Sequence, residues 1–95
     1  MVKFEMVAKS EDVDKIRLFF ERILPDTRKY EGCEGAIISR MSEQPDKFIL
    51  IEYWESNELF QNYMKWRTEI GDFNEFGSML AAEPDMQIFE VLTTA

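Results

Sequence analysis

Residues 47–55 read Lys47-Phe48-Ile49-Leu50-Ile51-Glu52-Tyr53-Trp54-Glu55, a run with the composition of a β-strand. Successive side chains of a strand point to opposite faces. One face therefore carries Phe48, Leu50 and Trp54, and the other carries Ile49, Ile51 and Tyr53. Because both faces are apolar, we expect both to be covered by protein.

Three further strands are expected around this one. Residues 35–42 are strand-like, and residues 43–46 have turn composition, which predicts a hairpin with residues 47–55. Residues 2–8 alternate between apolar and polar side chains. After Pro84 a last strand is expected, in which Met86, Ile88 and Leu92 share one face while Phe89 and Val91 share the other.

Two helices separate these strands. Ser10 and the acidic residues after it are typical of a helix N-terminus, and apolar residues then recur every three or four positions as far as Tyr30. Pro25 predicts a kink, followed by a second helical piece over residues 26–31. Ser56 is expected to cap the second helix, which Gly71 ends, and a short amphipathic piece follows.

The order β-α-β-β-α-β predicts an α+β protein with the ferredoxin-like fold, in which a four-stranded antiparallel sheet carries its helices on one side. The 95 residues contain no linker and no internal repeat, so residues 1–95 are expected to form a single domain.

Helices on one side would leave the other face of the sheet uncovered. That face carries Ile49, Ile51, Tyr53, Phe89 and Val91. Leaving them in water would forfeit roughly 1.5–3 kcal/mol each, which together is comparable to the stability of a small domain. We expect the same face of a second copy to cover them, which gives a two-fold homodimer. The alternative is a monomer whose C-terminal segment folds over the face.

Charge and composition limit the classes of partner and cofactor that the protein is expected to bind. The net charge is −8, and residues 51–95 hold nine acidic but only two basic side chains, so nucleic acid and anionic membrane are poor partners. No apolar run is long enough for a membrane span or a secretory signal, and we expect a cytoplasmic protein. The chain has one cysteine and no histidine, so the usual zinc, copper and haem-iron ligand sets cannot be assembled, and no cofactor is expected.

Two segments carry a resemblance to a known family: Ile51-Glu52-Tyr53-Trp54-Glu55-Ser56 with Glu58 and Phe60, and residues 27–35, Thr27-Arg28-Lys29-Tyr30-Glu31-Gly32-Cys33-Glu34-Gly35. Across nearly its whole length the chain resembles the antibiotic biosynthesis monooxygenase (ABM) family. The resemblance implies a dimeric α+β barrel that is built from ferredoxin-like units. The family includes cofactor-free oxygenases of aromatic compounds, quinol oxygenases and haem degraders, so the fold does not fix the chemistry.

The family's cofactor-free oxygenases imply a phenol-, anthrone- or quinol-like substrate in an apolar pocket between sheet and helices. Deprotonation gives an anion that can itself reduce dioxygen, so the protein needs only to exclude water, orient the ring and stabilise negative charge. The candidate catalytic residues are Glu52, Tyr63 and Arg67. The candidate substrate-binding residues are Trp54, Asn62, Trp66 and Arg28.

Structural roles are the alternative for each of these residues. Trp54, Tyr63 and Trp66 lie on apolar stripes and suit core packing. For Arg67 and Arg28 a pocket or ion-pair role stands against that of a surface arginine that snorkels to water. Glu52 is expected to be paired with an arginine or to lie at the rim, because an unpaired carboxylate is costly to bury. Cys33 is interpreted as a small packing residue.

The chain departs from the family in lacking histidine. The resemblance implies that many members carry a histidine where this chain has Tyr63, and that the haem-degrading branch has an iron-binding histidine near the position of Phe73. Haem degradation is therefore disfavoured, and Glu52, a tyrosine or the substrate's own acidity must supply the proton chemistry. The alternatives to a monooxygenase are a non-catalytic dimeric barrel that binds an apolar aromatic ligand, and an interaction protein that uses its acidic face.

Overall fold

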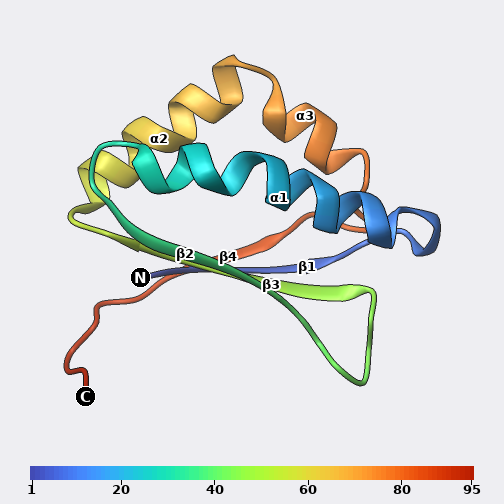
Figure 1. Cartoon of the computed structure of the whole chain (residues 1–95). Helices are drawn as coiled ribbons and strands as arrows, with labels where there is room; N and C mark the ends of the chain where they lie inside the picture. Colours follow the sequence, from blue (N-terminus) through green and yellow to red (C-terminus); the bar gives the residue numbers. More distant parts are fainter.

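The computed structural model describes all residues, 1–95. The elements are β1 (Val2–Val7), a short 3-10 turn (Ser10–Asp12), α1 (Val13–Lys29), β2 (Cys33–Arg40), β3 (Lys47–Trp54), α2 (Asn57–Glu69), α3 (Asp72–Gly77) and β4 (Asp85–Ile88). The strands form one antiparallel sheet in the order β2-β3-β1-β4, with the helices on one side of it (Figure 1). The predicted ferredoxin-like α+β fold is confirmed. No helix has the length and hydropathy that a membrane span requires.

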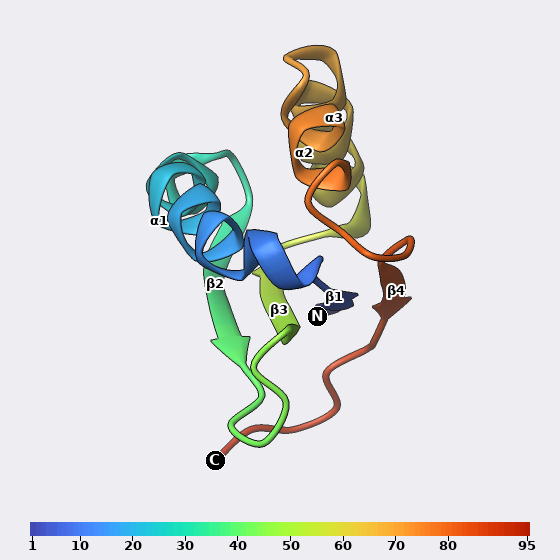
Figure 2. The same cartoon turned by 90° about the vertical axis from the view of Figure 1, so that its right-hand side faces the viewer.

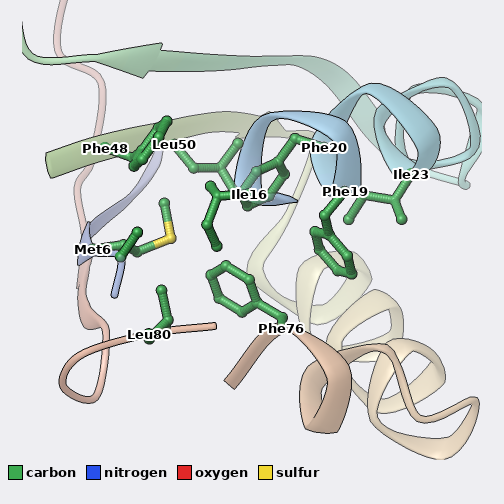
Figure 3. Packing of buried hydrophobic residues seen from close by; sticks show 10 residues of the cluster. Met6, Ile16, Phe19, Phe20, Ile23, Phe48, Leu50, Phe76 and Leu80 are labelled. Carbon is green, nitrogen blue, oxygen red and sulfur yellow. The ribbon is translucent and has the colours of Figure 1, made fainter. Parts of the chain in front are cut away.

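The helices form two groups over the sheet. Seen end on, α1 lies above β2 and β3, whereas α2 and α3 stand on the side of β1 and β4 (Figure 2). The core fills the space between them, with Ile16 and Phe20 of α1 and Phe76 of α3 against Met6 and Phe48 of the sheet (Figure 3). The alternation of residues 47–55 explains this, because Phe48 and Leu50 are buried beneath the helices.

Two details of the helices correct the sequence interpretation. Helix α1 continues through Pro25 to Lys29 and has no separate piece over residues 26–31. Pro25 removes only the hydrogen bond to the backbone carbonyl of Glu21. Because Glu21 is exposed, water can hydrogen-bond to that carbonyl instead. Ser10 caps no helix, because it lies in the 3-10 turn and its hydroxyl bonds the carboxylate of Glu11.

The start and the end of α2 follow the sequence prediction. The hydroxyl of Ser56 accepts a 3.2 Å hydrogen bond from the backbone N–H of Leu59, which satisfies one of the free donors in the first turn. Gly71 has a φ of 85°, a left-handed conformation that ends α2 and starts α3 at an angle to it.

The last strand is shorter than expected. Strand β4 ends at Ile88, and beyond it only Phe89 pairs with the sheet, by exchanging two backbone hydrogen bonds with Met1. Residues 89–95 then run along the side of the sheet that faces away from the helices (Figures 1 and 2). Leu92 lies beyond the end of β4 and is 85% exposed, so the predicted alternation does not extend to it.

The face of the sheet opposite the helices is open. Ile37 of β2 lies beside Ile51 of β3, and Gly35 lies beside Tyr53. Ile37 is 58% exposed and Tyr53 is 38% exposed, so the C-terminal residues do not cover this face within one chain. We call Ile37, Ile49, Ile51 and Tyr53 the open-face residues.

Candidate functional site

Glu52 lies on the covered face of β3, beneath the helices. It is 2% exposed, and its carboxylate takes part in none of the five ion pairs of the protein. It accepts a 3.0 Å hydrogen bond from Nε1 of Trp54. Burial raises the pKa of Glu52, and the hydrogen bond from Trp54 and the positive charge of Arg67 oppose that rise only in part.

The expectation that Glu52 pairs with an arginine or lies at the rim is wrong. Its side chain follows the inward alternation of β3, which takes it away from the rim. The charge of Arg67 acts on Glu52, but the N–H groups of Arg67 bond to other partners. Glu52 is therefore a buried acid without a cation bound to it.

Arg67 is 2% exposed and ties three helices together. Its Nη1 donates to Oδ2 of Asp72 in α3 at 2.7 Å. Its Nη2 donates to the carbonyl oxygen of Ile23 at 2.9 Å and to Oγ1 of Thr27 at 3.0 Å, both in α1. Its Nε donates to the hydroxyl of Tyr63 in α2 at 2.9 Å. Arg67 thus forms an ion pair with Asp72, one of the roles considered for it from the sequence.

The hydroxyl of Tyr63 is also engaged within the protein. It shares a 2.8 Å hydrogen bond with Oγ1 of Thr27. Thr27 donates its only side-chain proton to the carbonyl of Ile23 at 3.1 Å, so Tyr63 must be the donor in the Thr27–Tyr63 bond. Burial raises the pKa of Tyr63, which keeps the phenol protonated.

Aromatic rings surround these polar groups. The ring centroid of Trp54 lies 4.9 Å from that of Tyr63, and the ring of Trp66 stacks on Tyr30 at 5.1 Å. The guanidinium carbon of Arg67 sits 4.5 Å from the ring centroid of Trp66. The structure therefore brings together five of the predicted site residues, which are Glu52, Trp54, Tyr63, Trp66 and Arg67.

Arg28 and Asn62 do not join this group. Both are exposed. Nη1 of Arg28 donates to the backbone carbonyl of Cys33 at 2.7 Å, which fixes the start of β2 to the end of α1. The backbone carbonyl of Asn62, rather than its side chain, accepts a 3.4 Å hydrogen bond from the hydroxyl of Tyr30.

Sequence reasoning did not assign Tyr30, Thr27 and Asp72 to the site. The position of Thr27 could have indicated its role, because it lies on the apolar stripe of a helix, where a buried hydroxyl needs a hydrogen-bond partner. Asp72 gave none, since its approach to Arg67 depends on the turn at Gly71. Cys33 is buried, and burial raises the pKa of its thiol, in keeping with a packing role.

Two hollows border the group. The inner one lies between sheet and helices, has a volume of about 30 Å³, and is lined by ten hydrophobic residues and Glu52. This volume suits a water or dioxygen molecule rather than an aromatic ring. The outer one, about 430 Å³, lies at the end of β3 and is lined by Trp54, Phe60, Ile88 and Phe89 among others. The expected dry pocket beneath the helices is thus almost filled by side chains.

Comparison with known proteins places these features in context. The family model described as "Antibiotic biosynthesis monooxygenase" matches residues 1–68. A search of curated protein sequences finds no significant match to the chain.

Solved structures share the fold at low sequence identity. Rv0793 from Mycobacterium tuberculosis superposes with a TM-score of 0.88 at 14% identity, covering 99% of this chain and 95% of that one. A conserved protein from Methanosarcina mazei gives 0.85 at 19% identity, covering 93% and 87%. SnoaB, a cofactor-independent oxygenase from Streptomyces nogalater, gives 0.80 at 13% identity, covering 98% and 94%.

Proposed function

Because the chain belongs to the antibiotic biosynthesis monooxygenase family, we propose that it is a cofactor-independent monooxygenase of a quinol-, phenol- or anthrone-like substrate. The observation that carries the proposal is Glu52, a buried acid with no bound cation at the wall of an apolar cleft. Burying such a group costs stability, and acids with a raised pKa cluster at functional sites. No histidine competes for the role of base.

In the proposed reaction Glu52 is the general base. Its ionised carboxylate takes a proton from the substrate's hydroxyl or activated methylene, and its raised pKa makes it a stronger base than an exposed glutamate. The resulting anion gives an electron to dioxygen, and the two radicals combine into a peroxide. Glu52 then returns its proton to the peroxide, and loss of water from the resulting hydroperoxide yields the oxidised ring, with one oxygen atom of dioxygen in the product and the other in water.

Tyr63 and Arg67 take positioning roles in this proposal. Their polar groups bond to Thr27, Asp72 and Ile23, so they hold α1, α2 and α3 around the cleft rather than reaching for the substrate. The positive charge of Arg67 still favours negative charge at Glu52. Trp54 lines the outer hollow rather than the inner one, and its indole N–H binds the carboxylate of Glu52. Once the cleft has widened, a substrate ring that reaches Glu52 stacks against Trp54 in this proposal.

A ring can enter the inner hollow only if the cleft widens. Met64 of α2 and Phe73 of α3 line it and are only half-buried, so rotation of these two side chains is the proposed way to open it. The outer hollow needs no such movement and already has the volume of a small-ligand site. This favours a second candidate function, the binding of an apolar aromatic ligand beside Trp54 without catalysis.

Oxygen consumption separates the two functions. Purified protein is mixed with a panel of reduced quinols and anthrones, and dioxygen uptake is compared with the uncatalysed rate. The monooxygenase proposal expects uptake above that background for at least one substrate. If the ligands quench tryptophan fluorescence and dioxygen uptake stays at the uncatalysed rate, the protein binds these ligands without catalysis.

The proposed partner is a second copy of the chain. The open-face residues are apolar and partly exposed, and an isologous contact would cover both copies at once. Residues 89–95 leave the sheet on that side, so Phe89 and Val91 can add to the contact. A cytoplasmic location stays a prediction.

A further inference from the structure

The oxidisable rings of the protein are gathered in one place. Both tryptophans, Trp54 and Trp66, and two of the three tyrosines, Tyr30 and Tyr63, form one connected cluster. Tyr53 lies outside it, on the open face of the sheet. The main core beneath α1 uses a separate phenylalanine cluster of Phe19, Phe20 and Phe76, whose rings are much harder to oxidise.

Within the cluster every ring touches the next. Centroid separations are 4.9 Å between Trp54 and Tyr63, 5.3 Å between Tyr63 and Tyr30, and 5.1 Å between Tyr30 and Trp66. Tyr63 is buried, whereas Trp54, Tyr30 and Trp66 are partly exposed, and Trp54 lines the outer hollow. The rings therefore form an unbroken path for an electron between Trp54 at the outer hollow and the partly exposed rings of Tyr30 and Trp66.

The two tryptophans have opposite electrostatic surroundings. The indole N–H of Trp54 donates to the carboxylate of Glu52, which stabilises positive charge on that ring and can accept its proton. The guanidinium of Arg67 lies over Trp66 and opposes positive charge there. Removal of an electron from the cluster is thus easiest at Trp54, where loss of the electron can be coupled to loss of the N–H proton.

We propose that Trp54, with Glu52 as its proton acceptor, is a one-electron redox site that reduces oxygen-centred radicals, the hydroperoxyl and organic peroxyl class. Trp54 gives one electron to the radical and its indole proton to Glu52, and the reduced radical takes a proton from solvent to become a hydroperoxide. An electron then returns to Trp54 along Tyr63, Tyr30 and Trp66 from a surface reductant such as a thiol, and Glu52 returns the proton.

The source of such radicals rests on the proposed oxygenase reaction, in which the substrate anion gives an electron to dioxygen and leaves a substrate radical and superoxide in the cleft. Protonation of escaped superoxide gives the hydroperoxyl radical, and a second dioxygen molecule that adds to an escaped substrate radical gives an organic peroxyl radical. The redox site itself does not, because it consists only of side chains already in contact. A test that supplies its own oxidant therefore separates a failure of this inference from a failure of the oxygenase proposal.

The test is flash-quench oxidation with photogenerated tris(bipyridine)ruthenium(III), followed by transient absorption and electron paramagnetic resonance. The wild-type protein should give the neutral tryptophanyl radical. Trp54→Phe should lose that signal, Trp66→Phe should keep it, and Tyr53→Phe should behave like the wild type. In Glu52→Gln the indole has no proton acceptor, so the radical should appear as the protonated cation or in severalfold lower yield.

Two outcomes would overturn the assignment. One is a tryptophanyl signal that survives in Trp54→Phe and disappears in Trp66→Phe, since the oxidised ring would then be Trp66. The other is a neutral radical in Glu52→Gln at the wild-type yield. Because Trp54→Phe and Trp66→Phe remove the same type of ring from one cluster, each controls for the structural effect of the other.

Discussion

The indole N–H of Trp54 and the carboxylate of Glu52, two residues apart on β3, are joined by a 3.0 Å hydrogen bond. Alternation along the strand puts both side chains on the covered face, where the carboxylate is shielded from water. One neutral donor replaces little of the solvation that the carboxylate has lost. Burial therefore raises the pKa of Glu52 above that of an exposed glutamate, and its carboxylate, once ionised, is a stronger base.

The first prediction concerns stability against pH. Because the pKa of Glu52 is raised on folding, the folded protein holds a proton that the unfolded chain has released, over the window between the ordinary glutamate pKa and the raised one. The free energy of unfolding should fall as the pH rises through that window. Glu52→Gln should lose this fall and be more stable than the wild type above the window, as measured by urea unfolding at a series of pH values.

The exposed acid Glu55, at the end of the same strand, supplies the control for this measurement. Glu55→Gln should leave the pH dependence of the wild type in place. Parallel stability curves for the wild type and Glu52→Gln across the whole pH range would mean that folding does not raise the pKa of Glu52.

The second prediction concerns the Arg67–Asp72 ion pair, in which the side chains are 3% and 12% exposed. Arg67→Met leaves the carboxylate of Asp72 without its partner and should destabilise the protein by about 3–5 kcal/mol. The double variant with Asp72→Asn should lose less than the sum of the two single losses. Arg22→Met breaks an exposed pair with Glu75 and should cost less than about 1 kcal/mol. If the losses of stability of the two single variants are strictly additive in the double variant, as measured by urea unfolding, Arg67 and Asp72 are not coupled.

The third prediction separates two costs of replacing glycine. Gly32 and Gly71 both have a positive φ, at 89° and 85°. A methyl group on Gly32 would lie 2.5 Å from Cδ1 of Leu59, whereas one on Gly71 would have nothing within 4 Å. Gly71→Ala should therefore cost only the backbone strain of about 1–2 kcal/mol, and Gly32→Ala should cost clearly more. Equal losses of stability for Gly71→Ala and Gly32→Ala in thermal unfolding would rule out the contact with Leu59.

The fourth prediction concerns assembly. Ile51 lies in the centre of the open face, so Ile51→Lys would bury a charge in the proposed dimer contact and should give a monomer in light scattering. Leu18 on α1 is 55% exposed and away from that face, so Leu18→Lys should leave the dimer intact. A wild-type protein with the mass of one chain would contradict the proposed partner.

Much of the fold could be predicted because it follows from short-range patterns. The alternation of residues 47–55 and the cap at Ser56 act over a few residues, and both are present in the structure. The end of β4 could not be predicted in this way, since a strand stops where its neighbour stops, and β1 begins only at Val2. The continuation of α1 through Pro25 likewise depends on whether the carbonyl that loses its hydrogen bond is exposed to water, which is known only from the folded structure.

The candidate site was predictable by residue type but not by role. Arg67 stands out in the sequence as a base beside an apolar stripe, yet only the three-dimensional structure shows that Asp72 and α1 occupy its donors. The sequence also suggested that Glu52 would need a cation. The burial of this acid beside Trp54 is a tertiary property, because it depends on how the helices pack over β3.

The measurement that bears most directly on the proposed function is the rate of dioxygen consumption by Glu52→Gln on the best substrate of the quinol and anthrone panel. We predict that this rate falls to the uncatalysed background while the substrate still quenches tryptophan fluorescence, and that Glu69→Gln, which changes an exposed acid at the end of α2, keeps the wild-type rate. A wild-type rate in Glu52→Gln would contradict the assignment of Glu52 as the base.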